Sequence, residues 1–327
     1  MRHIDPTEDA ALRRGTPVRR PGSLSGQAPE PVVAVVVVNW NGWPDTLACL
    51  RSLAALEPPG CAHTIVVDNG SADDSVERIA AEFPGVDVVR SADNLGFAGG
   101  ANLGIRRALK LGVDFVWLLN NDATVEPDTL RALLAEADDR RVGIVGGVLV
   151  DPEEPDRVLA WGGGFVGPLG TTTALDGPGR LPDYVEGSSM LVRTALLERV
   201  GLFDEAFFFY YEDADLCRRA REAGWRIAVA PSARVAHAVG ASVNRGATGR
   251  SERADELQVE SGGVYLGKHS ERLLAPALGV RLAGIVLSRL ARREPRRIPT
   301  LVRALVRGAR RGRARRRRSD ASASPGG

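Results

Sequence analysis

The sequence predicts an α/β fold built on a doubly wound, mainly parallel sheet with helices on both faces, and three observations support it. Apolar, β-branched runs alternate with amphipathic segments of helical length from Pro31 onward. The first run, Val32–Val38, contains only Val and Ala, which is typical of a strand buried on both faces. Short polar segments follow the strands, at the edge where open α/β sheets bind ligands.

The individual elements follow in the order that repeated βα units require. After the first strand, residues 45–55 predict a helix that begins at Asp45 and places its leucines on one side. Further helices are expected at residues 97–111, 127–137 and 212–223. Further strands are expected at Thr64–Val67, Val86–Val89, Phe115–Leu119, Val142–Val150 and Ile227–Ala230.

Composition divides the 327 residues into an N-terminal segment, an α/β domain, a helical segment with a basic tail, and a short C-terminal end. Residues 1–30 and 319–327 lack hydrophobic periodicity and are rich in small and polar residues, which predicts disorder. Residues 31–245 form the predicted α/β domain, and residues 246–318 are expected to be helical with a basic tail. The three cysteines have no metal-binding spacing, so we expect free thiols in a reducing compartment.

The N-terminus shows no signal peptide, and no uninterrupted apolar stretch reaches the ~18 residues of a spanning helix. These features predict a cytoplasmic protein, or one bound to the cytosolic face of the cell membrane. Charge is unevenly distributed, because residues 291–318 carry thirteen Arg and only Glu294 as an acid. This segment is therefore +12 in a chain whose formal net charge is +2, which leaves about −10 for the rest.

Three polar segments follow predicted strands: Asn39–Gly42, Asp68–Ser71 and Asn120–Asp122. Turn chemistry alone accounts for any one of them, since Asn, Asp and Gly favour tight turns. Their convergence on one sheet edge favours a ligand site. No GxGxxG follows the first strand and no GxxxxGK[ST] occurs, which disfavours a dinucleotide-binding or P-loop site.

Five segments in order carry a more specific signal: VVVVNWNG at 35–42, VVDNGS at 66–71, NLGFAGGANLGI at 94–105, LLNND at 118–122 and YEDADLCR at 211–218. Together they resemble the family 2 glycosyltransferases with the GT-A fold, in particular the bacterial rhamnosyltransferase-like branch. The resemblance implies transfer of a sugar from a nucleotide diphosphate-sugar to an acceptor hydroxyl with inversion. It also implies a donor-binding half, 31–125, and an acceptor and catalytic half, 126–245.

By this resemblance Asp68 holds the nucleoside, although an Asx turn before Asp74 explains the same residue. The segment at 39–42 is expected to pack around the nucleotide. Gly99 belongs to a glycine cluster that lets backbone approach the ligand closely. The residues expected to bind the nucleotide-sugar are Asn39, Asn41, Asp68, Asn69, Asn94, Gly99, Asn102, Asn120 and Asn121.

The family's DxD motif, which binds a divalent cation, here reads Asn120-Asn121-Asp122 and keeps only its last carboxylate. One carboxylate is enough for Mg²⁺ when phosphates and water complete the shell. Some relatives place a metal-ligating histidine where His237 stands, and imidazole suits Mn²⁺. His237 is alternatively a structural residue. We therefore expect a Mn²⁺ or Mg²⁺ site at Asp122 and His237.

The helix at 212–223 carries the predicted catalytic acids. On a helical wheel Glu212 and Asp215 lie on a charged face, whereas Asp213 falls on the apolar face with Leu216 and Cys217. The resemblance assigns the general base to Asp213, the second acid of the Glu212-Asp213 pair. Burial would raise its pKa and make it a better base.

The acceptor side is expected at Trp161, Gly187 and Ser188. Trp161 either stacks on a sugar or anchors a glycine-rich loop in the core, and the aromatic run 207–211 is either core, lid or sugar platform. In the tail, apolar residues spaced as on one helix face run from Ile298 to Val306 among arginines. This pattern favours an anionic membrane surface over nucleic acid, because the tail has no aromatic groups for base stacking. A merely solubilising tail is the other interpretation.

Two other functions compete with sugar transfer as interpretations of the sequence. A sugar-1-phosphate nucleotidyltransferase would need a basic, Gly-rich loop after the first strand, where this chain has NWNGWPD. A non-catalytic nucleotide-sugar-binding or scaffold protein gains support from the incomplete DxD but not from the retained Asp213. The resemblance makes dTDP-rhamnose the first candidate donor, with UDP- and GDP-sugars open, and a glycan or polyprenyl-linked glycan the expected acceptor.

Overall fold

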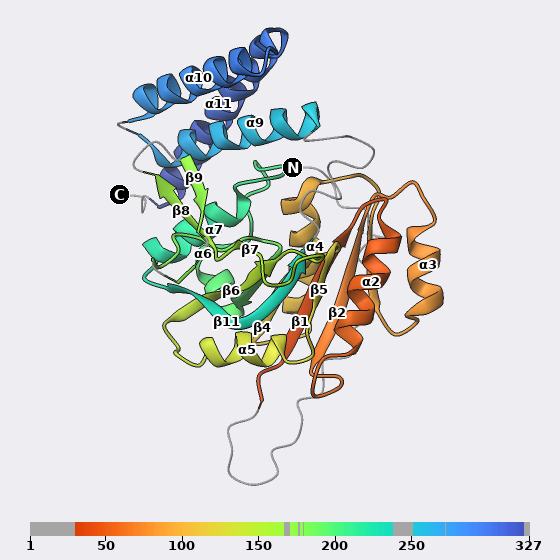
Figure 1. Ribbon diagram of the computed structural model, residues 1–327. Coiled ribbons are helices and arrows are strands. Elements are labelled where there is room, and N and C mark those ends of the chain that lie inside the picture. Colours follow the sequence, from red (N-terminus) through yellow and green to blue (C-terminus); the bar gives the residue numbers. More distant parts are fainter. Residues whose placement is uncertain are drawn as a thin grey trace.

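A computed structural model of the chain describes residues 30–166, 171–175, 177–178, 180–237, 251–271 and 273–323. The disorder predicted for residues 1–29 therefore lies outside the described residues. Within them, a nine-stranded mixed sheet forms the centre of the molecule, and three C-terminal helices stack above one end of it (Figure 1). The predicted α/β architecture with helices on both faces is confirmed.

The sheet has the strand order β3-β2-β1-β4-β10-β6-β11-β5, with β7 beside β6. Its strands are β1 Val33–Asn39, β2 Ala62–Asn69, β3 Asp87–Ser91, β4 Phe115–Asn120, β5 Ala123–Val125, β6 Val142–Val150, β7 Val158–Ala160, β10 Ser189–Arg193 and β11 Arg226–His237. β1, β2, β3 and β4 pair in parallel, as do β6 and β11, whereas β10 runs antiparallel to both β4 and β6. β8 Gly163–Val166 and β9 Thr171–Ala174 form a separate hairpin.

Helices cover both faces because the strands are apolar on both sides. One core contains Val36 of β1 and the apolar sides of α4 Gly96–Lys110, α6 Thr194–Val200 and α7 Glu212–Glu222. The other contains Val35 of β1 and the apolar sides of α2 Trp43–Ala54, α3 Ser75–Glu82 and α5 Thr129–Glu136. Alternate residues of one strand thus enter opposite cores, as a fully buried Val run predicts.

The antiparallel strand β10 is the main topological feature that the sequence did not predict. Its five residues lie between β4 and β6, so that Ser189 pairs with Leu119 of β4. Because β10 runs against β4, the residues just before β10 meet the carboxyl end of β4. The amide of Asn120 donates to the carbonyl of Ser188 at 3.1 Å and fixes this meeting point.

The C-terminal helices are α9 Glu252–His269, α10 Leu274–Ala291 and α11 Ile298–Ala323, with a short 3-10 turn at Pro295–Arg297. The apolar stripe predicted for a membrane surface packs partly inside the protein, since Leu301 and Leu305 of α11 are 2% and 3% exposed and contact Ile285 of α10, whereas Val306 is 41% exposed. Helix α11 also runs through residues 319–323, so the disorder predicted for 319–327 is wrong there, and 324–327 lie outside the described residues.

Glycines bring α9 and α11 into backbone contact. A Cβ atom on Gly308 would lie 2.0 Å from the carbonyl oxygen of Glu260, and one on Gly267 would lie 2.3 Å from that of Ala309. Real Cβ atoms do not approach so closely, so only glycine permits this crossing. The two helices therefore form one tightly packed unit.

Candidate active site

A cavity of about 830 Å³ opens at the carboxyl ends of β1, β2 and β4. The segment before β10, the start of α7, the end of β11 and the start of α9 complete its wall. Its lining residues are Val38, Trp40, Asn69, Asn94, Gly96, Phe97, Asn120, Asn121, Asp122, Tyr184, Glu186, Gly187, Ser188, Phe208, Phe209, Tyr210, Tyr211, Glu212, Asp213, Ala214, His237, Ser251, Arg253, Leu257 and Gln258. The sheet edge predicted to bind a ligand is thus hollow.

Asn39 and Asp68 lie beneath the cavity floor, and neither lines it. The Nδ2 group of Asn39 donates to Asp68 Oδ1 at 3.2 Å and to Ser71 Oγ at 3.1 Å, while its Oδ1 accepts from Thr46 Oγ1 at 2.8 Å. Both side chains are buried, with 0% and 3% exposed. The amide of Ser71 also donates to Asp68 Oδ2 at 3.4 Å, which is the Asx-turn contact. Both residues hold the loops after β1 and β2 together.

A second asparagine network reaches the cavity itself. Asn69 Nδ2 donates to Asn94 Oδ1 at 3.2 Å and to the carbonyl of Gly96 at 3.0 Å. Asn94 Oδ1 also accepts from the Gly96 amide at 2.8 Å, which ties the start of α4 to β2. Asn69 and Asn94 line the cavity, and so does Asn121, whose Nδ2 donates to Thr46 Oγ1 at 3.1 Å.

Three predicted donor-binding residues serve the fold instead. Asn102 is 1% exposed, donates to the carbonyl of Phe203 at 3.0 Å and accepts from the amide of the same residue, so it joins α4 to the segment before α7. Gly99 packs against Leu95, and Asn41 Oδ1 accepts from the Ala72 amide at 2.7 Å. None of the three lines the cavity. Their contacts within the protein give each of them a structural role, and their assignment to the ligand stays a prediction.

The aromatic run at residues 207–211, directly before α7, forms a wall of the cavity. Gly96 has φ +73°, and a Cβ there would lie 2.2 Å from the carbonyl oxygen of Phe208, so the run presses against the start of α4. Tyr210 and Tyr211 both adopt the left-handed region, with φ +73° and +70°. Phe207 is fully buried, whereas Phe208–Tyr211 face the cavity.

Antiparallel pairing of β5 with β11 brings His237 beside the Asn120–Asp122 segment. Its Nε2 atom lies 3.1 Å from Asp122 Oδ1 and 3.2 Å from Asn120 Nδ2, although 115 residues separate His237 from Asp122. Among the described residues, His237 Nδ1 is buried without a hydrogen-bond partner, and no group of three or more His, Cys, Asp or Glu gathers to hold a metal. The two predicted metal ligands are therefore brought together as a pair.

Three carboxylates surround the junction between the segment before β10 and α7. Asp213 lines the cavity, and its Oδ2 accepts from the Gly187 amide at 3.1 Å while its Oδ1 accepts from the Ala214 amide at 2.7 Å. Burial raises the pKa of Asp213, against the opposing effect of these two amides. Burial also raises the pKa of Glu212 well above its usual value, and the charge of Asp213 adds to this. The third carboxylate, Glu186, has no catalytic role predicted from the sequence, and its pKa is raised to about 7 by burial and then by Asp213.

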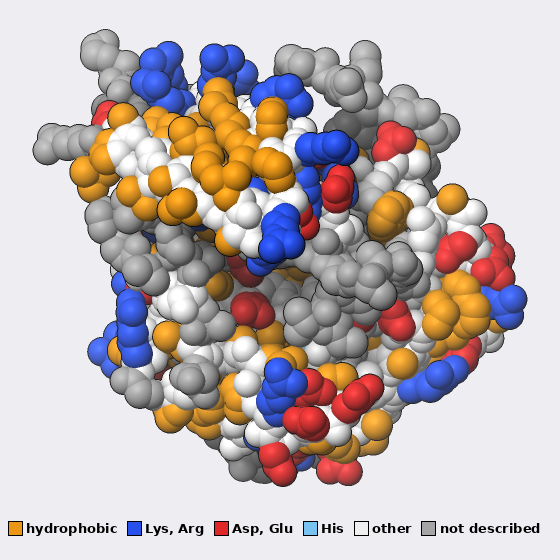
Figure 2. Space-filling model, turned by 45° about the horizontal axis from the view of Figure 1, so that its top comes forward, with side chains coloured by type: hydrophobic (Ala, Val, Ile, Leu, Met, Phe, Trp, Pro, Cys, Tyr) orange, Lys and Arg blue, Asp and Glu red, His pale blue; other side chains and the backbone are white. Residues whose placement is uncertain are grey.

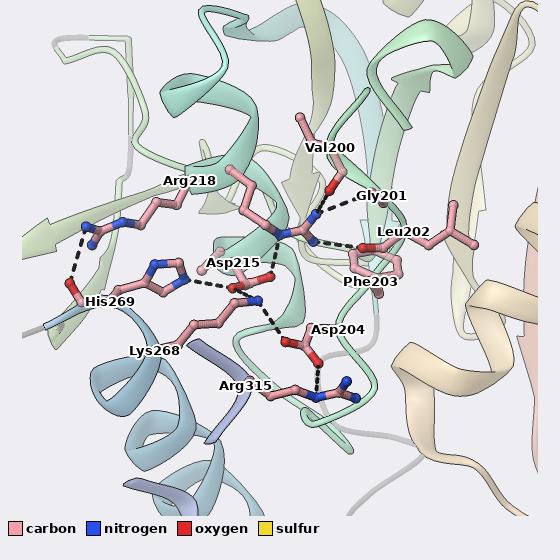
Figure 3. Close-up of polar contacts among 12 residues, drawn as sticks. Val200, Gly201, Leu202, Phe203, Asp204, Asp215, Arg218, Lys268, His269 and Arg315 are labelled. Carbon is pink, nitrogen blue, oxygen red and sulfur yellow. Dashed lines mark hydrogen bonds and ion pairs between the residues drawn. The ribbon is translucent and has the colours of Figure 1, made fainter. Parts of the chain in front are cut away.

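The wheel put Glu212 and Asp215 on a charged face, and both are buried instead, with 5% of Glu212 and 0% of Asp215 exposed. Asp215 lies among three basic side chains, with Arg219 Nε at 2.8 Å, Lys268 Nζ at 2.8 Å and His269 Nε2 at 2.7 Å. Figure 3 shows Lys268 and His269 pointing toward it. Burial alone would raise the pKa of Asp215, but the hydrogen bond from His269 and these charges hold it well below its usual range. Helix α9 supplies two of the three partners and covers the face that a wheel shows as exposed.

On the acceptor side, Gly187 and Ser188 line the cavity as predicted, but Trp161 does not. Trp161 stands between β7 and β8, where its amide donates to the carbonyl of Leu175 at 2.6 Å. The start of α9 contributes Arg253 and Gln258 to the cavity, which the sequence analysis missed because nothing local in the sequence places α9 there.

Comparison with known proteins identifies the family. The family model described as "Glycosyltransferase like family 2" matches residues 29–253. N-acetylglucosaminyl-diphospho-decaprenol L-rhamnosyltransferase of Mycobacterium tuberculosis is 30% identical over 234 residues, which cover 63% of this chain and 76% of that protein. The dTDP-rhamnosyl transferase RfbF of Shigella flexneri is 24% identical over 209 residues, covering 64% and 69%.

Solved structures show the same fold. The mannosyltransferase PcManGT from Pyrobaculum calidifontis, in complex with GDP-Man and Mn²⁺, superposes with a TM-score of 0.55 at 18% identity and covers 92% of each chain. GalNAc-T7 with UDP, GalNAc and Mn²⁺ gives a TM-score of 0.53 at 16% identity, covering 63% of this chain and 44% of that one. At these identities the likeness establishes the fold alone.

Proposed function

The chain belongs to the family 2 glycosyltransferases, and we propose that it transfers a sugar from a nucleotide diphosphate-sugar to a glycan hydroxyl with inversion, using Asp213 as general base. The observation that carries the proposal is the setting of Asp213. Its carboxylate lines the cavity at the ligand-binding edge of the sheet and is held by the Gly187 amide at 3.1 Å. A carboxylate fixed in this way faces the space that a substrate would fill.

The proposed step is a single displacement. Asp213 takes the proton of the acceptor hydroxyl as the hydroxyl oxygen attacks the anomeric carbon, and the nucleotide diphosphate leaves from the opposite face with the bonding electrons. Its raised pKa makes Asp213 a stronger base than an exposed carboxylate. Burial and the charge of Asp213 raise the pKa of the neighbouring Glu212, which favours its neutral form and so limits the negative charge beside the base.

The donor is proposed to lie along the Asn69, Asn94 and Asn121 side of the cavity, with dTDP-rhamnose as the first candidate. Two relatives carry rhamnosyltransferase names, and one name specifies an acceptor linked through diphosphate to decaprenol. We propose a lipid-linked glycan acceptor of this type, approached by the protein from the cytosolic face of the membrane. Gly187, Ser188 and Arg253 line the side of the cavity that the acceptor would enter.

The pair Asp122 and His237 fits a divalent cation. Asp122 Oδ1 and His237 Nε2 lie 3.1 Å apart on largely buried side chains, and both would hold such an ion. One oxygen and one nitrogen ligand suit Mn²⁺ better than Mg²⁺. When bound, such an ion would neutralise the charge of the leaving diphosphate. Asn120 Nδ2 lies 3.2 Å from His237 Nε2, and we propose that it contacts the diphosphate.

The competing function is non-catalytic binding of a nucleotide-sugar, which the shortened DxD motif favours. Retention of a base-like Asp213 inside the cavity argues against it, because a binding protein gains nothing from an amide-held carboxylate with a raised pKa.

Transfer and donor hydrolysis measured with dTDP-rhamnose and a panel of UDP-, GDP- and dTDP-sugars, with Mn²⁺ or Mg²⁺, test the proposal. Asp213→Asn is expected to lower the rate by about 10²–10⁴-fold, the usual contribution of a general base. The matched control Asp138→Asn changes an exposed aspartate away from the cavity and should leave the rate unchanged. Undiminished turnover in Asp213→Asn would remove it from the mechanism, and binding of a donor without turnover of any acceptor would favour the binding protein.

A further inference from the structure

Helix α10 presents an outer face without a single polar side chain. Its exposed residues are Ala275, Pro276, Gly279, Val280, Leu282, Ala283, Gly284, Leu287, Leu290 and Ala291. The large ones are strongly exposed, with Leu287 at 67% and Leu290 at 53%. A helix facing water normally carries charged or polar residues on its outer side. This face is therefore built to contact something apolar.

Both charged residues of α10 turn inward. Arg289 is buried and pairs with Asp255 at 3.1 Å and Glu294 at 2.7 Å. Arg281 donates to the Tyr211 hydroxyl, and its guanidinium lies 5.5 Å from the centre of that ring. By length and composition, α10 is the one helix in the described part of the chain that could cross a membrane, with only 17% of it buried in the protein. The inward arginines anchor it to the body instead.

We propose that this face of α10 lies in the interface of an anionic membrane. Figure 2 shows apolar side chains gathered over the C-terminal helices, with basic side chains beside them. The exposed arginines Arg292, Arg293 and Arg296 directly follow the apolar face, and residues 291–318 carry a net charge of +12. Such a combination of apolar face and adjoining basic groups binds anionic lipid, each basic residue near the surface adding to the attraction.

A second copy of the chain fits this face less well. The exposed large side chains of α10 amount to an apolar patch on the order of a few hundred Å², whereas a stable dimer buries about 800 Å² on each partner. The patch is large enough for an interfacial helix, which needs only one face immersed.

The position of α10 also places the cavity beside the lipid surface. Tyr211, which Arg281 of α10 contacts, lines the cavity immediately before Glu212 and Asp213. Figure 2 shows a hollow containing acidic side chains next to the apolar band. A membrane seated on α10 therefore lies close to the site where a lipid-linked acceptor is proposed to react, although the docking itself does not depend on that reaction.

Co-sedimentation of the full chain with vesicles of phosphatidylcholine containing phosphatidylglycerol, compared with phosphatidylcholine alone, tests the proposal. The chain should bind the anionic vesicles, and Leu287→Glu combined with Leu290→Glu should weaken binding at least about tenfold, since burying one leucine accounts for about that factor. The matched control Leu181→Glu alters a leucine that is 78% exposed on the catalytic domain and should bind like wild type. Arg292→Gln with Arg296→Gln should reduce binding and its sensitivity to salt.

Absence of vesicle binding, or equal binding by the Leu287/Leu290 variant and wild type, would overturn the proposal. So would a dimer in light scattering that the same variant converts to monomer without any vesicle binding. If the acidic pair lowers the melting temperature, the milder Leu287→Gln with Leu290→Gln serves the same comparison. No sugar donor is used, so this result stands or falls separately from the transfer assay.

Discussion

Removing the buried carboxylate of Asp215 is expected to destabilise the protein strongly. Asp215 is fully buried and contacts Arg219, Lys268 and His269 within 2.8 Å, so Asp215→Ala leaves three basic groups around a site without its counter-charge. Breaking a buried ion pair by removing one partner costs about 3–5 kcal/mol. Two of the partners keep other contacts, because Lys268 also pairs with Asp204 at 2.8 Å and Arg219 donates to the carbonyls of residues 200–202 (Figure 3). The lower end, about 3 kcal/mol, is therefore expected.

For a domain of this size, each 1 kcal/mol lowers the melting temperature by about 2–4 °C, so the variant should melt about 6–12 °C lower. Thermal unfolding followed by circular dichroism at pH 7 measures this. Glu82→Ala is the control, since its pair with Arg51 is equally short at 2.7 Å but lies on the surface, where such pairs contribute less than about 1 kcal/mol. A melting temperature for Asp215→Ala no lower than that of Glu82→Ala would refute the reasoning that this cluster holds α9 to α7.

Three further predictions concern the cavity and the C-terminal helices. The pKa of Glu186 is about 7 in the folded protein and about 4.5 in the unfolded chain, so its burial lowers the stability progressively as pH rises between these values. Glu186→Gln should therefore melt at a higher temperature than wild type at pH 8 in metal-free buffer, with a much smaller gain at pH 4.5. Gly308→Ala should lower the stability by about 1–3 kcal/mol in denaturant titrations, because the added Cβ would lie 2.0 Å from the Glu260 carbonyl oxygen. Gly279→Ala, whose Cβ would have no neighbour within 4 Å, should raise the stability by up to about 1 kcal/mol. Equal effects of the two variants would contradict the close crossing of α9 and α11. Asp122→Ala should weaken Mn²⁺ binding in the presence of dTDP at least about tenfold, read by electron paramagnetic resonance of the free ion, and unchanged affinity would place the metal elsewhere.

The sheet was predictable because its signal is local. The Val run of β1 and the apolar run of β6 each bury every or nearly every residue, and both strands begin within a residue of their predicted bounds. Strand β10 has only five residues between a polar segment and a helix, so no local pattern distinguished it. Its antiparallel insertion is decided by the tertiary fold, and with it the position of Glu186 beside Asp213.

The site was predictable only for those motif residues whose side chains also line the cavity. Asn69, Asn121 and Asp213 line the cavity as expected, and the separation of 115 residues between Asp122 and His237 is closed by strand pairing. Asn102 and Asp215 are both fully buried, which the sequence did not indicate, because a sequence pattern does not show which other elements cover a residue. The covering element of Asp215 is a helix that begins 37 residues later in the chain.

The backbone contact between α9 and α11 has a consequence for which acceptors can be used. Helices that touch through glycine have no side-chain layer that could compress or repack, so α9 and α11 form a rigid base, to which α10 is anchored through the Arg289–Asp255 pair. If α10 rests on a bilayer, the cavity is held at one height above the lipid headgroups. The number of sugar units between the lipid and the accepting hydroxyl then decides whether that hydroxyl reaches Asp213. Chain length of the acceptor would thus be selected by the stiffness of a helix pair that lies outside the sheet.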